Sequence, residues 1–195
     1  KRFLTLKNKK MAYPKITVNT GLAREIIASD TIPIPAPDLP VLSGTTTAST
    51  ANKLVDVGAD FSNVSVNDIV YNTTDNTSAI VTAIDTSTIL SVSANIFTSP
   101  EDYEIFLGGP NGSSRINSSE GCLLYVGSSA SILQDITPGA GTADPRYVNI
   151  RVKTISGNSV TFENFPVGNY LPIQIVQLYS TSTTAAARNT CLAIW

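Results

Sequence analysis

The sequence predicts an all-β protein, and three observations carry this prediction. Residues 147–179 alternate apolar and polar side chains with the period of two expected of a half-buried strand. Turn signals recur at intervals of about 8–12 residues across residues 54–107, which is typical of an antiparallel meander. Charged residues are only 14% of the chain and hydrophobic residues 42%, with Thr, Ser and Asn filling the outer positions.

We therefore expect three regions along the 195 residues. Residues 1–42 form an N-terminal arm and an extended proline-rich strap, and residues 43–109 form an inserted small β-barrel or meander. Residues 110–195 form an antiparallel β-sandwich or barrel. The boundary between the first two regions is set by the Ser-, Thr- and Ala-rich stretch 43–52, which has the composition of a linker.

Within the first region, residues 22–28 have the spacing of a short helix. Ile32 to Pro40 follows, and its four prolines exclude a helix and a central strand. The strap should therefore be extended, with Ile32 and Ile34 as the apolar side chains available for packing. Such a segment lies either across a partner chain or across its own sheet.

The inserted region predicts a series of short strands separated by polar turns. The expected strands cover residues 54–57, 66–72, 79–84, 89–92 and 103–107. Phe61 and Phe97 lie between them as candidate core residues. Together these strands should close on themselves as a small barrel or sandwich.

The last region is the best patterned. Residues 148–152 alternate, and Gly157-Asn158 can supply the positive φ angles of a two-residue hairpin turn before a second strand over residues 160–163. Residues 164–169 predict a break. A third strand over residues 171–179 changes its apolar side near Ile175-Val176, which indicates a bulge or burial on both faces.

Charge is unevenly distributed. Five of the thirteen basic residues lie in residues 1–10, which contain no acid, so residues 11–195 carry eight basic against fifteen acidic groups, a net charge of −7. One interpretation is a solvated basic tail. The other is an arm that docks on an acidic neighbour through its few apolar side chains.

Two cysteines, Cys122 and Cys191, do not make a disulfide framework, and we expect both to be buried and unpaired in apolar strands. No stretch reaches the roughly 18 apolar residues of a membrane span, and no secretion signal is evident. We therefore expect no membrane partner and assembly in the cytoplasm of the producing cell.

The sequence predicts no enzymatic activity. The chain has no histidine, which excludes a Ser-His-Asp triad and a histidine zinc site. No phosphate-binding or dinucleotide motif occurs, so no cofactor, metal or nucleic acid is expected. Glu101-Asp102 is interpreted as a solvated turn rather than a glycosidase pair. Asp56, Asp60 and Asp68 are interpreted as turn residues rather than a calcium site, because their spacing does not match an EF-hand loop.

A family resemblance rests on four segments of the last region, covering about 75 of the 195 residues. They are Leu124-Tyr125-Val126-Gly127, the run from Ser159 to Ile173, the Thr-rich Ser180 to Thr184, and the terminal Leu192-Ala193-Ile194-Trp195. The second segment contains three short motifs: Val160-Thr161-Phe162, Pro166-Val167-Gly168 and Leu171-Pro172-Ile173. In this order they resemble the head spike base proteins of tailed phages and gene transfer agents. The string from Asp68 to Ala79 is similar to a module common in phage structural proteins.

The resemblance implies a non-enzymatic virion protein that forms a homo-oligomer, a trimer or pentamer, on the capsid surface as a spike base, vertex or decoration protein. Its partners would be the major capsid or another virion protein, and a spike or fibre protein. The alternatives are a carbohydrate-binding β module for host attachment, or a tail or neck structural protein. Ten residues are candidates for the assembly interface: Lys1, Arg2, Phe3, Leu4, Leu6, Ile32, Pro33, Ile34, Pro35 and Trp195.

Overall fold

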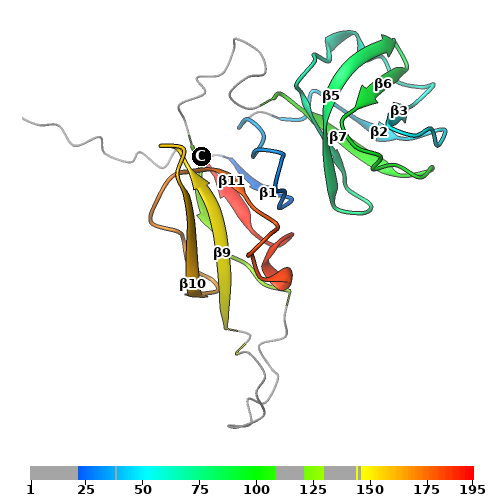
Figure 1. Ribbon diagram of the computed structural model, residues 1–195. Coiled ribbons are helices and arrows are strands. Elements are labelled where there is room, and N and C mark those ends of the chain that lie inside the picture. The colour runs from blue at the N-terminus through cyan, green and yellow to red at the C-terminus, as the bar shows by residue number, and fades with distance from the viewer. Residues whose placement is uncertain (1–21, 38, 109–120, 130–143, 145) are drawn as a thin grey trace, which may run out of the picture.

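The computed structural model describes residues 22–37, 39–108, 121–129, 144 and 146–195, and in this part every strand pairing is antiparallel. The chain is all-β and forms two lobes (Figure 1). Residues 41–107 form one lobe, which we call the barrel. Residues 22–36 and the described residues from 121 to 195 form the other, which we call the base.

The barrel is a curled six-stranded sheet with the order β2-β7-β4-β5-β6-β3. Its strands are β2 (Leu42–Thr45), β3 (Lys53–Val55), β4 (Ile69–Asn72), β5 (Thr77–Thr86), β6 (Ile89–Val92) and β7 (Asp102–Phe106), with a 3-10 turn η1 (Phe61–Asn63). The two edges of the sheet meet, because the backbone N–H of Thr47, just after β2, donates to the Val55 carbonyl of β3 at 2.8 Å. Phe61, Phe97 and Tyr103 fill the interior as a packed aromatic group. The barrel is therefore closed at this point, where Ala48 and Val55 also form an isolated bridge.

The predicted linker over residues 43–52 is wrong at its start, because β2 occupies it and pairs with β7. Composition is misleading here because Gly44 serves packing rather than flexibility. A Cβ atom on Gly44 would lie 2.7 Å from the Tyr103 hydroxyl and 2.8 Å from Asp56 Oδ2. These two groups form a buried hydrogen bond of 2.8 Å, so the missing side chain makes room for it.

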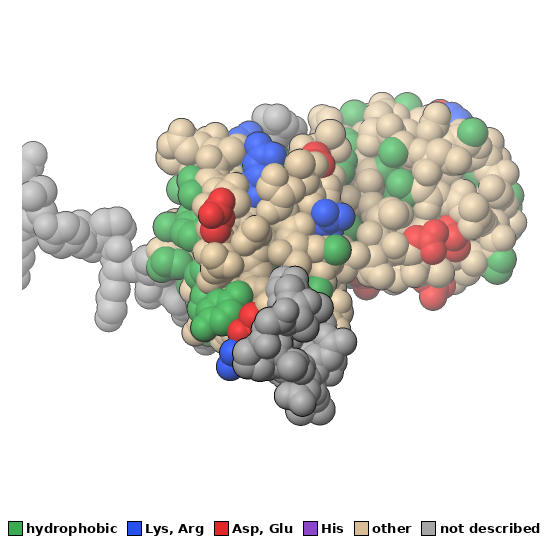
Figure 2. Space-filling model, turned by 60° about the horizontal axis from the view of Figure 1, so that its bottom comes forward, with side chains coloured by type: hydrophobic (Ala, Val, Ile, Leu, Met, Phe, Trp, Pro, Cys, Tyr) green, Lys and Arg blue, Asp and Glu red, His purple; other side chains and the backbone are tan. Residues whose placement is uncertain are grey.

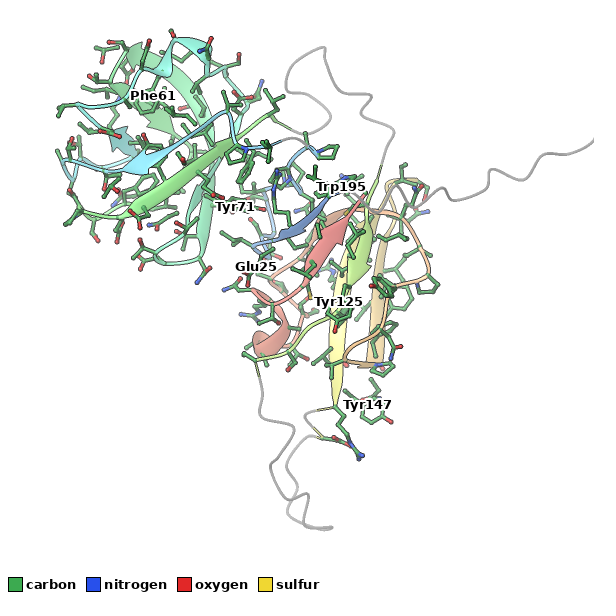
Figure 3. All side chains as sticks on the ribbon, turned by 180° about the vertical axis from the view of Figure 1, so that it is seen from behind. Glu25, Phe61, Tyr71, Tyr125, Tyr147 and Trp195 are labelled. Atoms are coloured by element: carbon green, nitrogen blue, oxygen red, sulfur yellow. The ribbon has the colours of Figure 1, made fainter. Side chains whose placement is uncertain are left out.

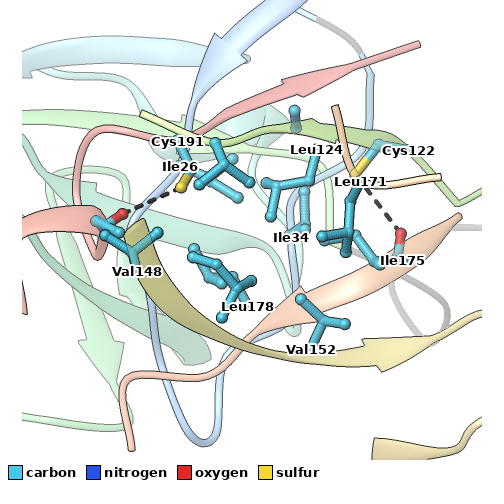
Figure 4. Close-up of a cluster of buried hydrophobic side chains, with 14 residues drawn as sticks. Ile26, Ile34, Cys122, Leu124, Val148, Val152, Leu171, Ile175, Leu178 and Cys191 are labelled. Carbon is cyan, nitrogen blue, oxygen red and sulfur yellow. Dashed lines mark hydrogen bonds between the residues drawn. The ribbon is translucent and has the colours of Figure 1, made fainter. Parts of the chain in front are cut away.

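The base consists of two three-stranded sheets with the orders β1-β12-β8 and β10-β9-β11. Its elements are β1 (Ala23–Glu25), β8 (Leu123–Tyr125), β9 (Tyr147–Thr154), β10 (Ser159–Pro166), β11 (Ile175–Leu178), the 3-10 turn η2 (Ala185–Ala187) and β12 (Leu192–Ile194). The sheets enclose a core drawn from both ends of the chain, with Ile26 and Ile34 packed among residues of β8, β9, β11 and β12 (Figure 4). This arrangement is the expected antiparallel sandwich.

The alternation predicted for residues 148–152 is confirmed, because Val148, Ile150 and Val152 are buried. The bulge near Ile175-Val176 is also confirmed, as a register shift between β11 and β9. The hairpin turn differs from the prediction, since only Gly157, with φ of 87°, takes a positive angle and Asn158 does not. The break predicted from residue 164 begins later: β10 runs on to Pro166 through a bulge at Glu163-Asn164, where Asn164 has φ of 51°.

The short helix predicted over residues 22–28 is wrong: residues 23–25 form β1, which pairs with β12. A helix of this length is marginal in water, whereas the β12 edge offers a full set of hydrogen-bond partners. After β1 the chain becomes the strap, residues 26–36. The N–H of Ser29 donates to the Leu178 carbonyl and that of Ile34 to the Val176 carbonyl, each at 2.9 Å, so the strap covers the outer edge of β11.

The strap also joins the two lobes. Ile32 packs with Ile69, Tyr71 and Phe106 of the barrel in a small buried cluster. Beside it the Arg24 guanidinium lies 3.8 Å from the Phe106 ring centroid and 5.8 Å from that of Trp195, and donates to the Ala36 carbonyl at 2.8 Å. Figure 3 shows Tyr71 and Trp195 at this junction.

The two cysteines are free and buried in the base core, as predicted. The Cys191 thiol lies 3.1 Å from the Ala187 carbonyl, and that of Cys122 lies 3.5 Å from the Ile175 carbonyl (Figure 4). Burial raises the pKa of Cys122 to about 12 and that of Cys191 to about 11. Because the thiolate is the reactive form, both groups are inert while the core is closed.

We predict that Arg24→Ala lowers the free energy of unfolding by about 2 kcal/mol, because it removes a cation–π contact and a charged hydrogen bond together. Arg24→Lys should recover part of this loss, since an ammonium keeps the charge but not the planar stacking. Denaturant titration measures both variants. An unchanged midpoint in Arg24→Ala would show that the junction does not depend on this side chain.

We also predict that Cys122 and Cys191 resist iodoacetamide at pH 8 in the folded protein and react together once it is unfolded. Their common core gives them one opening event. Peptide mass spectrometry after timed labelling measures each site. Fast labelling of either thiol without denaturant would contradict the burial that both share.

Candidate assembly surface

The structure places the strap residues of the predicted interface inside their own chain. Ile32 is buried at the junction between the lobes, and Ile34 is buried in the base core. Pro35 is also buried, and Pro33 is half-buried. The strap therefore lies across its own sheet. Ile32, Ile34 and Pro35 are therefore buried within the single chain, and their role at a subunit interface stays a prediction.

Apart from the half-buried Pro33, the remaining interface candidates divide into two groups. Lys1, Arg2, Phe3, Leu4 and Leu6 lie outside the described residues, and their assembly role stays a prediction. Trp195 is half-buried: its ring packs against the base core, and its backbone N–H donates to the Leu22 carbonyl at 3.2 Å. Part of the indole is therefore already used within the subunit.

The three carboxylates considered as a calcium site are held in separate structural roles. Asp56 accepts the Tyr103 hydroxyl, Asp60 caps the 3-10 turn η1, and Asp68 accepts the backbone N–H groups of Ser65 and Gly108. Burial raises the pKa of Asp68. Within the described ranges no cluster of three or more metal-ligating side chains occurs.

Glu101 and Asp102 also differ from the expected solvated turn, because Glu101 is buried. Its carboxylate accepts the N–H and hydroxyl of Thr98, each at 2.6 Å, and the Asn72 amide at 3.0 Å. The Thr98 hydrogen bonds lower the pKa of Glu101, and its charge raises the pKa of the neighbouring Asp75. Asp102 is exposed and points to Thr45 instead. This arrangement closes one end of the barrel rather than presenting two catalytic carboxylates.

The most distinctive surface of the base is strand β10. It is the edge strand of the sheet β10-β9-β11, and its residues are exposed or half-buried throughout. Val160, Phe162 and Phe165 are opposite Val152, Ile150 and Val148 in the register, so they share the core-facing side of the sheet. Yet Val160 is 37% exposed, and the two phenylalanines are only partly buried. The core of the base therefore does not fully cover the apolar side chains of β10, and part of their surface stays exposed to solvent.

A second apolar feature lies on the outside of the other sheet. Tyr125 of β8 and Tyr170 form a bridge, and their rings meet edge to face with centroids 5.3 Å apart. Tyr170 is 57% exposed. Tyr147, at the start of β9, is 46% exposed and lies at the far end of the base (Figure 3). These are the exposed aromatic side chains of the described residues.

Figure 2 shows hydrophobic side chains gathered along the side of the base that faces away from the barrel, the side on which β10 lies in Figure 1. Glu163 is the one charged residue within β10. A strand edge with so little charge and with apolar side chains at its rim is a typical pairing surface.

The sequence predicts β10 as a strand but does not predict its exposure to solvent. The available signals were Asn164 at the bulge and Pro166 at the strand end, since both residue types are frequent at sheet edges. No local sequence pattern predicts the role of Arg24, because its partners Ala36, Phe106 and Trp195 are distant in the sequence.

None of the helical segments in the described residues is long and apolar enough to span a membrane. Comparisons with protein-family models, with curated proteins and with solved structures find no match to this chain.

Proposed function

We propose that this chain is a non-enzymatic structural protein of a tailed-phage virion that self-associates and sits on the capsid surface, as a spike base, vertex or decoration protein. The observation that carries the proposal is the uncovered apolar rim of β10, which suits a chain that works in an assembly. The virion location rests on the resemblance of residues 159–173 and their flanking segments to head spike base proteins.

Three further properties support a structural role. The full chain has no histidine, and its charged content of 14% gives little repulsion between copies. The carboxylates best placed for chemistry, Asp56 and Glu101, are engaged in hydrogen bonds that hold the barrel together. Each of these groups is therefore explained by folding alone.

A carbohydrate-binding role fits less well. Sugar recognition of this kind needs several exposed aromatic rings on one face, because ring faces stack on sugar rings. The exposed aromatic residues Tyr147 and Tyr170 do not form such a platform, since Tyr170 contacts Tyr125 while Tyr147 lies at the far end of the base.

The proposal gives the chain at least two kinds of partner. One is a further copy of itself, with a trimer or pentamer expected from the family resemblance. The other is the major capsid or another virion protein, together with a spike or fibre protein carried on the base. The basic segment 1–10 suits an acidic neighbour, since residues 11–195 have a net charge of −7.

We predict that purified heads of the source phage retain the protein and that deleting residues 1–10 weakens its attachment. Because the segment carries five positive charges, the residual binding should also depend less on salt. Co-sedimentation of tagged protein with heads over a salt series measures both effects. A variant with Lys7, Lys9 and Lys10 changed to Gln keeps the length of the arm and serves as the matched control.

Absence of the full-length protein from particles at every salt concentration would contradict the virion proposal. Attachment that is unchanged by the deletion would show instead that residues 1–10 take no part in it.

A further inference from the structure

The outer edge of β10 is the one long strand edge that no other described segment covers. The barrel closes on itself through Thr47 and Val55, and the strap covers the outer edge of β11. The outer edge of β8 is covered too, because the N–H of Leu171 donates to the Leu124 carbonyl and that of Val126 to the Asn169 carbonyl. The remaining uncovered strand of the base sheets, β1, has three residues, whereas β10 has eight.

Two backbone hydrogen bonds of β9 decide which backbone groups of β10 face outward. The N–H of Thr154 donates to the Asn158 carbonyl at 2.8 Å, and on the other side of β9 the N–H of Tyr179 donates to the Arg151 carbonyl at 2.9 Å. Backbone groups alternate in direction along an antiparallel strand. Val160 and Phe162 therefore direct their N–H and C=O groups toward β9. Those of Ser159, Thr161 and Glu163 point to the open side.

We propose that β10 pairs antiparallel with β10 of a second copy of this chain, around a two-fold axis at Thr161. This inference builds on the self-association in the proposed function and adds a second kind of contact between copies, with its own surface and register. Thr161 then faces Thr161 of the second copy, and Ser159 faces Glu163 in both directions. All three of these residues have outward backbone groups, so every facing pair can exchange hydrogen bonds. Pairing centred on Val160 or Phe162 would also use outward groups, but it would place Val160 opposite Val160 or Phe162 opposite Phe162, and Glu163 would no longer face Ser159.

The same register covers the exposed apolar rim. On the core-facing side, Val160 of one copy lies opposite Phe162 of the other, and the two-fold axis repeats this contact. Val160 is 37% exposed and Phe162 half-buried in the single chain. Cross-strand pairs of an aromatic and a β-branched residue are among the favourable ones in antiparallel sheets.

The register is also complementary in charge. Ser159 pairs with Lys153 of β9, so Glu163 of one copy reaches the position beside Lys153 of the other. Their Cα atoms are then about 10 Å apart, two strand spacings, a distance that a lysine and a glutamate side chain span together. Two such pairs form per two-fold contact. The outer face therefore favours this register over one in which the glutamates face each other.

The contact is short, because the bulge at Glu163-Asn164 and Pro166 end the regular part of the strand. Small interfaces give weak complexes, so the dimer of the isolated protein should form at high protein concentration. Being isologous, it joins two subunits only. It is thus a different contact from the one that closes a trimer or pentamer.

Cross-linking tests the two-fold axis directly. Thr161→Cys should form a disulfide dimer under mild oxidation, because facing Cα atoms in a hydrogen-bonded pair are about 5.5 Å apart, within disulfide range. Thr82→Cys, at an exposed threonine of β5 in the closed barrel, is the control and should stay monomeric. Equal cross-linking of both variants, or none in Thr161→Cys, would overturn the proposal.

Light scattering of the isolated protein, up to about 1 mM, tests the pairing itself, since short contacts are weak. Thr161→Pro removes an outward N–H and should abolish the dimer, whereas Thr161→Val should keep it. Lys153→Glu should weaken the dimer about tenfold, and Lys153→Glu combined with Glu163→Lys should restore it. If Thr161→Pro fails to fold, this charge exchange decides the question. A wild-type monomer at every concentration, or no rescue in the double variant, would overturn the proposal.

The outcome is separable from the proposed function. A protein that attaches to heads but never dimerises through β10 would refute this pairing alone. A β10 dimer that is absent from particles would refute the virion role alone.

Discussion

The hydrogen bonds between the strap and β11 are the constraint on which the rest of the structure depends. An uncovered strand leaves a row of backbone donors and acceptors without partners, and the strap supplies partners to β11 through Ser29 and Ile34. The same segment places Ile26 and Ile34 in the base core and Ile32 at the barrel. A single extended segment therefore completes the base and fixes the barrel to it.

The prolines suit the strap to this task. Proline favours an extended backbone and lacks an N–H group, so a strap with alternating prolines pairs at selected residues and ends the sheet there. Ile34 donates to β11 while the prolines on either side cannot. Among the described residues, the sheet β10-β9-β11 is thus terminated on the side of the strap and left open on the side of β10. This asymmetry is what gives the base one surface suited to another subunit.

The sequence predicts the parts of this fold that depend on local pattern. The alternation at Val148, Ile150 and Val152 predicts β9, and the change of apolar side near Ile175 predicts the bulge in β11. The β1 and β2 strands could not be predicted in this way, because both exist through pairing with residues far away in the chain. For β2, the decisive fact is that Gly44 makes room for the Tyr103–Asp56 hydrogen bond, a contact between residues 47 positions apart. The candidate site could not be predicted for the same reason. Whether the edge of β10 is exposed depends on where distant segments of the chain pack.

Within the described residues, β10 has an open edge with a defined set of outward backbone groups. Amide hydrogen exchange of the dilute protein, read residue by residue by NMR, tests this arrangement most directly. We expect the amides of Ser159, Thr161 and Glu163 to exchange quickly and those of Val160 and Phe162, which face β9, to be protected. Equal protection of all five amides in the dilute protein would show that another segment of the chain covers this edge, and would contradict the account.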